Sequence, residues 1–514
     1  MLNPRHLLLV LILALTAAFA LAQEPQRGGT LTVAVGQDLV TFDRMMVTAP
    51  PAIVRAHVFD GLFSFDENFL PQPTLVEAFE TSDDGLTWTF ELLRDVEFHD
   101  GTPMTAADVI ASFDRYMRVG SRAGEFARVE RWEAVDDHTV RFHLSSPWAA
   151  FTESLGFDAG GFAVYPEWLV EEWGDSVGAS NFIGTGPYMV GEIIPEESYR
   201  LVRYENHRSA AGPSSFSAGT RNSYVDEIIF LPISDPATRV SAVLTGEVDI
   251  AYELPLDAFV RLDAASNVNV QTTSPGYRVY IKLNATEGPF ADPILRRALQ
   301  TAIDLEAHMF VQGPEHLWRT NTAPRFQEGQ WMWSPNLDSF YPNDMERARE
   351  LVAESDYDGE TIILLGSPGR TLEFNIVPVL DQTMREMGLN VRVESYDAAT
   401  FSQVRRDVSA WHIKHAGGPS AVPAARISSS LVDRTGSVWA NFPEEEWDEY
   451  YSVLEESLDL DARQAGIEQL NLILGEYANE IWIGDVFSLT ACGLRVQNCP
   501  DAYALWLTDV WIDD

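Results

Sequence analysis

Alternating apolar and polar residues predict β-strands at several points along the chain. Residues 30–35 ("TLTVAV") alternate with β-branched side chains, and residues 86–92 ("LTWTFEL") are apolar at every second position. The apolar positions of the second segment are Leu86, Trp88, Phe90 and Leu92. Further strands are predicted at 139–147 ("TVRFHLSSP") and, after a Gly-rich turn, within 183–193 ("IGTGPYMVGEI").

Helices are predicted where apolar residues recur every three to four positions behind a capping residue. Thr105, followed three residues later by Asp108, forms a capping box. The apolar stripe behind it comprises Val109, Ile110, Phe113 and Met117. Asp292 caps a second helix, and Asp235 opens a third helix that ends at Gly246.

The order of these elements predicts a two-lobed α/β protein. Residues 225–254 read in order as strand, loop, helix and strand, and a new unit is expected to begin near residue 275. Residues 360–396 form a strand–helix–strand unit, which implies a parallel strand pair with a right-handed crossover. Residues 409–418 ("SAWHIKHAGG") predict a strand leading into a Gly-rich loop. Two helices, at about 443–457 and 461–477, precede a short strand-rich tail.

The first 22 residues have the pattern of a secretory signal peptide. A basic start at Arg5 is followed by an apolar run from 7 to 20 and by Ala20-Leu21-Ala22, an A-x-A cleavage site. A transmembrane anchor is the alternative, but the run is short and ends in small residues. The leader has no Cys to carry a lipid, and no later stretch reaches the roughly 18 apolar residues of a spanning helix. The mature protein is expected to be soluble and periplasmic.

The charge of the chain excludes whole classes of partner. The 514 residues carry a formal charge of −42, so nucleic acids and anionic lipids would be repelled. Lysine occurs only at 282 and 414. Adaptation to salt and an ordinary acidic extracellular protein both explain this composition. The length allows two or three packed units.

The two cysteines, Cys492 and Cys499, lie close together in "ACGLRVQNC". In an oxidising compartment such a pair is expected to form one disulfide. Two free thiols are the alternative. A metal site is disfavoured, because no His or second Cys pair lies nearby in the sequence.

The segment 82–109 ("SDDGLTWTFELLRDVEFHDGTPMTAADV") raises the question of catalysis, because His99 and Asp100 stand among many carboxylates. A secreted carboxylate-dependent hydrolase is therefore a remote alternative. However, the sequence has no G-x-S-x-G elbow, H-E-x-x-H helix, Walker loop or dinucleotide fingerprint. Asp100-Gly101, like Asp60-Gly61, has the composition of a turn. We therefore predict no catalytic residues, no cofactor and no metal.

Histidine and tryptophan are the other residue types that could contact a ligand. His412 and His415 lie three apart on a predicted strand, so they face opposite sides and cannot easily chelate one metal together. Tryptophans mostly belong to cores, but some can line a pocket and stack on sugars or peptide side chains. Trp439 is assigned to the ligand site on this basis.

The segment 75–115, "LVEAFETSDDGLTWTFELLRDVEFHDGTPMTAADVIASFDR", resembles the signature of family 5 extracellular solute-binding proteins of ABC transporters, the peptide/nickel type. The resemblance extends over nearly the whole mature chain, although Arg44 stands where the family usually has Pro. The other matching blocks are "LVTFDRMM", "GTGPYMV", "VDEIIFLPISDPATRVSAVLTGEVDI" and "YIKLNATEGPFADPILRRALQTAIDLEAHM".

The resemblance implies the large two-lobed periplasmic-binding-protein fold of type II. Lobe I would comprise residues 27–275 plus 486–514, with an extra subdomain at about 55–185, and lobe II would comprise 276–485. The lobes would close on a solute by a hinge and then present it to ABC permease subunits. The resemblance also implies a monomer that binds its solute without converting it.

The resemblance further implies a ligand site between the lobes, built from four segments. Lobe I would contribute the stretch after the "LVTFDRMM" block and the stretch after the "GEVDI" block. Lobe II would contribute its first residues and the loop at the end of the strand 409–418. The residues concerned are Met46, Val47, Thr48, Ala49, Tyr252, Glu253, Gly276, Tyr277, Arg278, Lys414, His415, Ala416, Gly417, Gly418 and Ser420.

The last of these segments bears on the ligand class. Peptide binders of the family have an Asp there that holds the peptide ammonium, whereas this chain has Ser420 in that register. A buried ammonium without a carboxylate partner is costly. Either another acid such as Glu253 supplies the charge for an oligopeptide, or the ligand is an oligosaccharide or another non-peptide solute.

Overall fold

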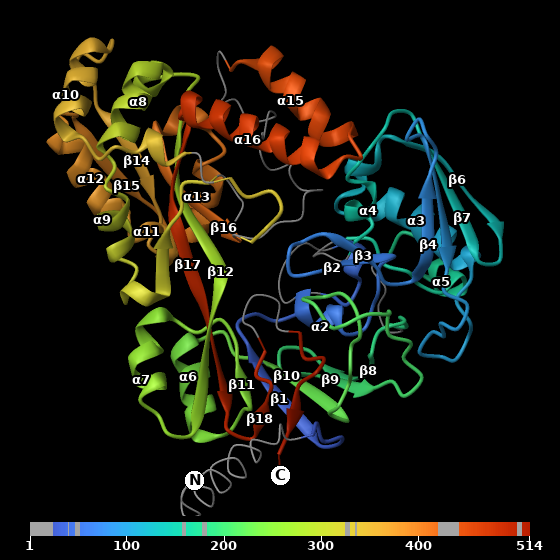
Figure 1. Ribbon diagram of the computed structural model, residues 1–514. Helices are drawn as coiled ribbons and strands as arrows, with labels where there is room; N and C mark the ends of the chain where they lie inside the picture. The colour runs from blue at the N-terminus through green and yellow to red at the C-terminus, as the bar shows by residue number, and fades with distance from the viewer. Residues whose placement is uncertain are drawn as a thin grey trace, which may run out of the picture.

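Figure 1 shows the computed structural model. The structure describes residues 24–39, 41–46, 52–156, 161–176, 182–323, 329–334, 337–419, 442–500 and 506–513. The predicted signal peptide therefore lies outside the described residues.

One 11-stranded sheet runs through the molecule. Its main path, in spatial order, is β15 (Val391–Ser395), β14 (Ile362–Gly366), β16 (Ile413–Pro419), β12 (Val268–Leu283), β17 (Glu480–Gly493), β11 (Ile250–Ala251), β1 (Thr30–Val35), β10 (Glu227–Pro232), β9 (Ser198–Arg203) and β8 (Tyr188–Ile194). The short strand β13 (Trp318–Thr320) pairs with β17.

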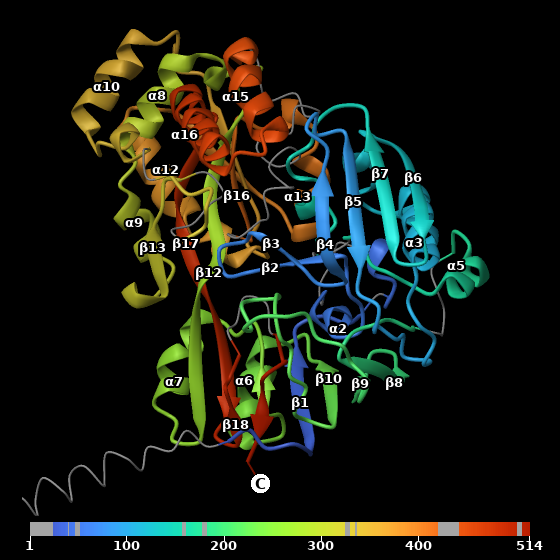
Figure 2. The same cartoon turned by 45° about the vertical axis from the view of Figure 1, so that its right-hand side comes forward.

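The long strands β12 and β17 connect the two halves of the molecule. They pair antiparallel and run together from the lower half to the upper half in Figures 1 and 2. A new unit was expected to begin near 275, but β12 starts earlier and continues through that point, with a register shift between Thr273 and Tyr277. Gly276 lies at this shift, where a Cβ atom would come within 2.2 Å of the Val486 carbonyl oxygen. A glycine is therefore needed for the two strands to approach.

Each half contains three neighbouring parallel strands. The strand that comes first in the sequence lies in the middle, and the other two lie on either side of it. In the lower half β1 lies between β10 and β11, and in the upper half β14 lies between β15 and β16. The predicted parallel pair within 360–396 is thus confirmed. Tyr277, close to the strand crossing, pairs with the last residue of β16, and Leu254, just after β11, donates its N–H to Leu489 of β17. The carboxyl ends of both triplets therefore point toward the crossing from opposite sides.

Capping residues begin the helices where the sequence predicts them. α3 (Ala106–Val119) has the Thr105–Asp108 capping box, and α6 (Pro236–Thr245) runs from the Asp235 cap to a left-handed Gly246. α8 (Pro293–Ala302) is capped by Asp292. The predicted helix after β14 is divided into α11 (Thr371–Phe374) and α12 (Val377–Glu386). Pro378 lies in the first turn of α12, where proline is tolerated because its missing N–H would have no helical partner.

The predicted strand-rich tail after 477 is confirmed, because β17 alone has 14 residues. One other expectation was wrong. Asp60-Gly61 does not form a turn: Asp60 is buried and pairs with Arg221, with 2.6 Å between the Asp60 Oδ1 and Arg221 Nη2 atoms. The Asp100-Gly101 turn, by contrast, is present, with Gly101 at φ +82° and its N–H bonded to the Phe98 carbonyl.

A second sheet forms a subdomain on the right of Figure 1. Its strands are β4 (Val76–Thr81), β5 (Thr87–Leu92), β7 (Thr139–Leu144) and β6 (Val129–Asp136), in that order. Helix α3 packs on this sheet through Phe113, which contacts Phe142 edge-on. The aromatic core of the subdomain is continuous with that of the lower half, since one cluster joins Phe90 and Phe142 to Leu31 and Phe230. The subdomain and the lower half therefore form one packed unit.

Helices cover the upper half. They are α8, α9 (Leu305–Phe310), α10 (Met345–Glu354), α12, α13 (Ala398–Val404), α15 (Glu444–Glu456) and α16 (Leu460–Tyr477). The lower half carries α2 (Ala52–Ala56), α6 and α7 (Phe259–Asp263), and the subdomain carries α4 (Phe151–Ser154) and α5 (Glu167–Trp173) as well as α3. Shorter pairings join β2 (Phe63–Phe65) to β3 (Pro71–Pro73) and β18 (Val496–Gln497) to β19 (Trp511–Ile512). Among the described residues no helix has both the length and the apolarity needed to cross a membrane.

Candidate functional site

The candidate site lies between the two sets of strand ends. In open parallel sheets, ligands bind outside the carboxyl ends of the strands, where the chain reverses its direction across the sheet. The carboxyl ends of β1 and β11 fulfil this rule in the lower half, and those of β14 and β16 fulfil it in the upper half. We call the first set of residues, Gly36, Tyr252 and Glu253, the lower wall. We call the second set, Tyr277, Arg370, Glu373 and His415, the upper wall.

The lower wall is shaped by Arg239 of α6. This buried guanidinium donates to the carbonyl oxygens of Tyr252, at 3.1 Å, and Glu253, at 2.7 Å. Glu253 has a left-handed backbone, with φ +51°. Its side chain is exposed and reaches back toward β1, since a Cβ atom on Gly36 would lie 3.2 Å from Glu253 Oε2. Partial desolvation by the neighbouring protein raises the pKa of this carboxylate.

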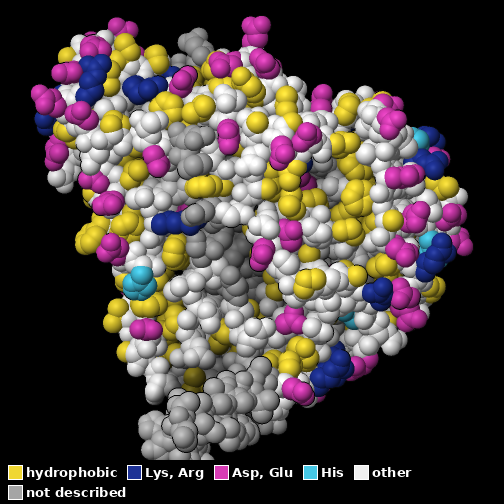
Figure 3. All heavy atoms as spheres, viewed as in Figure 1, with side chains coloured by type: hydrophobic (Ala, Val, Ile, Leu, Met, Phe, Trp, Pro, Cys, Tyr) yellow, Lys and Arg dark blue, Asp and Glu magenta, His cyan; other side chains and the backbone are white. Residues whose placement is uncertain are grey.

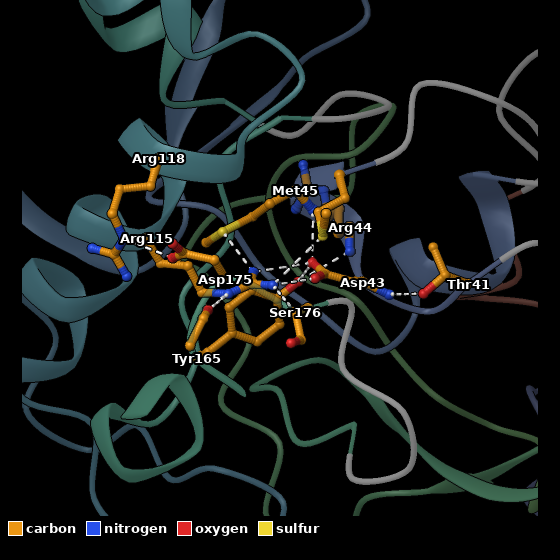
Figure 4. A network of polar contacts seen from close by, with 11 residues as sticks. Thr41, Asp43, Arg44, Met45, Arg115, Arg118, Tyr165, Asp175 and Ser176 are labelled. Carbon is orange, nitrogen blue, oxygen red and sulfur yellow. Dashed lines mark hydrogen bonds and ion pairs between the residues drawn. The ribbon is translucent and has the colours of Figure 1, made fainter. Parts of the chain in front are cut away.

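The segment that leads to Met46 is fixed by a buried ion pair, shown in Figure 4. The Arg115 guanidinium from α3 and the Asp43 carboxylate are both fully buried, with 2.5 Å between Nη2 and Oδ2. Tyr165 donates its hydroxyl to Asp43 at 3.3 Å and accepts from the Arg44 N–H at 3.1 Å. Arg44, which stands where the family usually has Pro, is itself buried. The ion pair and the Tyr165 hydrogen bonds thus hold the residues just before Met46 in place. Val47, Thr48 and Ala49 lie outside the described residues.

The upper wall is a network centred on Glu373. Its Oε1 atom accepts from the Tyr277 hydroxyl and from Arg370 Nη2, and its Oε2 atom accepts from Arg370 Nε and from His415 Nδ1, the last at 3.1 Å. His415 Nε2 in turn accepts from the Ser367 N–H at 2.9 Å, which fixes the neutral tautomer protonated on Nδ1. The ring of Phe401 stacks on His415. Burial opposes ionisation of Glu373, but these hydrogen bonds prevail and lower its pKa to about 2.

Glycine makes room for this network. A Cβ atom on Gly417 of β16 would lie 2.5 Å from the Tyr277 ring and 2.8 Å from Glu373 Cγ. Any side chain there would push Tyr277 and Glu373 apart. Ala416 and Gly418, its neighbours in β16, pair with Tyr280 and Arg278 of β12.

The structure gives two of the sequence-predicted residues other partners. Arg278 is buried and donates to Asp485 Oδ1 at 2.8 Å and to the Ala323 carbonyl at 2.6 Å, so its guanidinium joins β12 to β17. The Asp485 carboxylate also accepts from Asn321, and although burial opposes ionisation, Arg278 leads the groups that lower its pKa. Lys414 places its ammonium 4.3 Å from the centre of the Trp411 ring. Ser420 and Trp439 lie outside the described residues.

Sequence reasoning missed Arg370 and Glu373. Both belong to "GSPGRTLEF" (366–374), a Gly- and Pro-containing loop directly after a buried strand. That position is the signal that could have found them, because such a loop at a strand end is a common ligand site in parallel sheets. The carboxylate itself gave no signal in a chain with 77 acidic residues.

His99 belongs to the scaffold. Its Nδ1 atom accepts from the Gly184 N–H at 3.2 Å, and its Nε2 atom lies 2.9 Å from the Gly186 carbonyl oxygen. The histidine thereby fastens the "VEFHDGT" segment to the "GTGPYMV" segment. Desolvation by the surrounding protein lowers the pKa of His99 to about 4. Gly184 is required because a Cβ atom there would come within 2.1 Å of the Val58 carbonyl oxygen.

The remaining candidates are a metal site and the pair of cysteines. Within the described ranges, no three His, Cys, Asp or Glu side chains gather as a metal site would need. His412 and His415 have separate partners, since His412 Nδ1 accepts from the Ile363 N–H at 3.0 Å. Cys492 at the end of β17 is joined to Cys499 by a disulfide, with 6.1 Å between their Cα atoms.

The chain is similar to known proteins over most of its length. A relative from Sinorhizobium fredii, named a probable peptide ABC transporter periplasmic-binding protein, is 28% identical over 90% of this chain and 91% of its own length. The glutathione-binding protein GsiB of Salmonella choleraesuis is 27% identical over 72% of this chain and 70% of its own length. The crystal structure of the ABC transporter substrate-binding protein CtaP from Listeria monocytogenes superposes with a TM-score of 0.81 at 21% identity, covering 95% of this chain and all of CtaP.

The structural likeness shows the two-lobed type II fold of periplasmic binding proteins. The family model for bacterial extracellular solute-binding proteins, family 5, matches residues 71–429. These proteins bind solutes for ABC importers rather than catalyse reactions. The chain therefore belongs to the family 5 bacterial extracellular solute-binding proteins.

Proposed function

We propose that the protein captures an oligopeptide between its two lobes and delivers it to the permease of an ABC importer. In this proposal lobe I comprises residues 27–275 and 486–514, with the subdomain at 55–185, and lobe II comprises 276–485. The capture of a peptide is supported above all by the arrangement of the two walls, which face the strand crossing from opposite sides. The lower wall has the exposed Glu253 carboxylate, and the upper wall has Arg370.

Charge on the described walls favours a zwitterionic solute. Glu373 accepts four hydrogen bonds and has no acceptor site left for a ligand ammonium. Glu253 is exposed, so we assign the ammonium to it, in place of the family Asp that Ser420 replaces. Arg370 retains 31% of its side-chain surface and Nη1 donors that can meet a carboxylate. Peptides and glutathione, the solutes named for the two relatives, carry both groups.

We further propose that the solute is released unchanged and that the protein acts in the periplasm as a monomer after its leader is removed behind Ala22. The engagement of both His99 ring nitrogens by the Gly184–Gly186 turn supports this over the hydrolase alternative. Incubation of the protein with bound peptide, followed by mass spectrometry, tests it. Recovery of cleaved peptide would contradict the proposal.

The ligand class is tested by isothermal titration calorimetry on ligand-stripped protein. Tripeptides, their N-acetylated and C-amidated forms, and cello-oligosaccharides are compared. We expect tripeptides to bind and N-acetylation to weaken binding at least about 30-fold, because a charged hydrogen bond is lost and the Glu253 carboxylate is left without its partner.

The Glu253→Gln variant makes this assignment specific. It should weaken tripeptide binding at least about tenfold, and N-acetylation should then have little further effect, because the two changes remove the same interaction. Glu306→Gln, an exposed carboxylate on α9 away from both walls, is the matched control and should bind as the wild type does. Binding of oligosaccharides without tripeptides would overturn the peptide proposal and leave the two-lobed receptor intact.

A further inference from the structure

A five-residue motif, D-P-x-x-R, begins one helix in each half of the molecule. It opens α6 as "DPATR" (235–239) and α8 as "DPILR" (292–296). In both copies the Asp is the N-cap, the Pro lies in the first turn and the Arg is buried. Nη1 of each Arg donates to the two carbonyl oxygens directly before its own cap, at 2.7 to 3.1 Å. The two arginines thus close the starts of their helices in the same way.

The remaining donors of the two arginines have different targets. Nε of Arg296 donates to the carbonyl oxygen of Tyr477 at the end of α16, and Tyr477 belongs to neither wall. In Arg239, by contrast, Nε and Nη2 donate to the carbonyl oxygens of Tyr252 and Glu253, in the lower wall, at 3.1 and 2.7 Å. The same motif therefore serves packing in the upper half and reaches the candidate site in the lower half.

The turn that Arg239 contacts has a strained backbone. Glu253 lies in the left-handed region at φ +51°, which costs free energy for a residue with a Cβ atom. Its neighbours are fixed on both sides: the Tyr252 N–H donates to β1 at 3.0 Å, and the Leu254 N–H donates to β17 at 2.9 Å. Such a conformation persists only where the surrounding structure imposes it. The two bonds from Arg239 to this turn contribute to that constraint.

Arg239 also lies close to the Glu253 carboxylate. Glu253 Oε2 and Arg239 Nη1 lie 3.2 and 3.3 Å from the point where a Cβ atom on Gly36 would stand. The four carbonyl oxygens that Arg239 contacts satisfy its N–H groups but carry no net charge, so the charge of the guanidinium acts on the carboxylate. Desolvation raises the pKa of Glu253, and Arg239 is the charged group that opposes this rise. Asp235, in turn, acts on Arg239.

We propose that Arg239 is the positioning residue for recognition of the ligand ammonium: it holds the Tyr252–Glu253 turn in the conformation that presents the Glu253 carboxylate to the solute. Its positive charge also stabilises the carboxylate in its ionised form, which an ammonium requires. Arg239 acts through Glu253 and does not itself contact the solute. The proposal rests on the assignment of the ammonium to Glu253 in the proposed function, and it names the residue on which that assignment depends.

The test compares tripeptides with their N-acetylated forms by isothermal titration calorimetry on ligand-stripped protein. We call the ratio of the two dissociation constants the amine selectivity. Arg239→Met should lower it at least about tenfold, because the Glu253 carboxylate loses both its orientation and the neighbouring charge. Arg239→Lys should lower it about threefold, because an ammonium keeps the charge but cannot reach four carbonyl oxygens as the guanidinium fork does. The cost of C-amidation, which reports on Arg370, should stay as in wild type.

The pH dependence separates charge from shape. Loss of the Arg239 charge raises the pKa of Glu253 further, so the carboxylate is neutralised at a higher pH and the ammonium loses its partner there. Between pH 7.5 and 5.5, tripeptide affinity of Arg239→Met should therefore fall at least about threefold more than that of wild type. Arg239→Lys should keep the wild-type profile, because its charge is retained. A loss of packing alone would leave the pH profile of both variants unchanged.

The second copy of the motif supplies the matched controls, Arg296→Met and Arg296→Lys. They remove an equally buried guanidinium that also donates to the carbonyl oxygens before its helix and to a distant segment. Amine selectivity and its pH profile should be those of wild type in both, whatever the loss of stability. If Arg239→Met fails to fold, Arg239→Lys decides the question, since its lowered amine selectivity is expected from the lost fork alone.

The proposal is overturned if a folded Arg239 variant keeps the wild-type amine selectivity, or if the Arg296 variants lower it as much. Either result, with wild type still selective, removes the role of Arg239 and leaves the proposed function standing. Wild type that binds no tripeptide, or that binds acetylated and free tripeptides equally, instead contradicts the proposed function itself, and the role of Arg239 falls with it.

Discussion

Glu373 shows how a buried charge is kept ionised next to the proposed ligand. Its two carboxylate oxygens accept four hydrogen bonds from Tyr277, Arg370 and His415. These donors replace the water that burial removes, and the charge of Arg370 balances that of the carboxylate. The arrangement also holds Arg370 in one orientation, as a residue presented to a ligand carboxylate must be held.

The lowered pKa of Glu373 predicts a specific pH dependence of stability. The pKa is about 2 in the folded protein, against an ordinary value of 4.5, so ionisation favours the folded state. This contribution is complete above pH 4.5 and is lost as the pH falls from 4.5 toward 2. By linkage it amounts to about 3 kcal/mol at neutral pH.

Urea unfolding of wild type and Glu373→Gln at several pH values measures this contribution. We expect the variant to be less stable by about 3 kcal/mol at pH 6, and the difference to shrink steadily below pH 4.5. Glu354→Gln, an exposed carboxylate on α10, is the control and should show no such trend. A difference that stays constant down to pH 3 would show that Glu373 acts through shape and not through charge.

At the scale of single residues, the sequence revealed turn chemistry better than site chemistry. The Asp100-Gly101 turn could be predicted because glycine at positive φ leaves a local signal. Glu373 and Arg370 could not, because their importance comes from Tyr277 and His415, which are distant in sequence and become neighbours only when β12 and β16 pair. The Asp60-Gly61 turn was wrongly predicted for the same reason, since Arg221, the partner of Asp60, is 161 residues away.

At the scale of elements, capping residues predicted the starts of helices most reliably. Asp108 goes beyond the predicted capping box: its Oδ2 atom accepts from the Thr105 N–H at 2.7 Å, and its Oδ1 atom accepts from the Glu167 N–H at 2.8 Å. The second bond fixes the start of α5 against the start of α3. One carboxylate therefore positions two helices of the subdomain.

Replacing Asp108 should destabilise the protein more than replacing a cap that serves one helix. We expect Asp108→Ala to lower the free energy of unfolding by about 2 kcal/mol and Asp235→Ala, which caps α6 alone, by about 1 kcal/mol. Urea unfolding followed by circular dichroism measures both. Equal effects of the two substitutions would show that the bond to Glu167 adds nothing to stability.

The strands that cross between lobes were the elements hardest to predict. β17 is buried on both faces along most of its length, so its sequence "EIWIGDVFSLTACG" lacks the alternation that marks a half-buried strand. β12 changes its surroundings where it passes from one lobe to the other, and its apolar pattern is interrupted at "SPG" (274–276). The break in pattern at which a new unit was expected lies within β12, where the strand passes from one half of the molecule to the other.

At the scale of the whole molecule, the two lobes share one arrangement of strands. Each places a central strand between two parallel neighbours, and each directs its strand ends toward the crossing. The two-lobed fold could be predicted because the five family blocks occur in order along the chain. The ion pair between Arg463 of α16 and Glu153 of α4 could not, because the two residues are 310 positions apart and neither has a distinctive sequence context.

The net charge of −42 belongs to this scale as well, and Figure 3 shows acidic side chains distributed over the visible face with few Lys and Arg among them. Repulsion between these carboxylates disfavours the compact state, and dissolved salt screens it. The screening length falls from about 30 Å at 0.01 M to about 8 Å at 0.15 M and about 3 Å at 1 M. Most of the repulsion should therefore disappear at moderate ionic strength.

Thermal unfolding in sodium chloride distinguishes the two explanations left open for the acidic composition. If the chain is an ordinary acidic exported protein, its melting temperature should rise by about 5 °C between 0.01 and 0.2 M and then level off, because screening saturates. Adaptation to salt instead requires a rise that continues into the molar range, since hydrated ions must then be bound by the surface. We expect the first result, because many of the acidic side chains already have arginine partners: Arg347 lies within 2.9 Å of both Glu350 and Glu354. Sucrose at matched osmolality is the control, since it acts by exclusion and not by screening. A continuing rise in salt without a comparable effect of sucrose would establish a surface built for high salt.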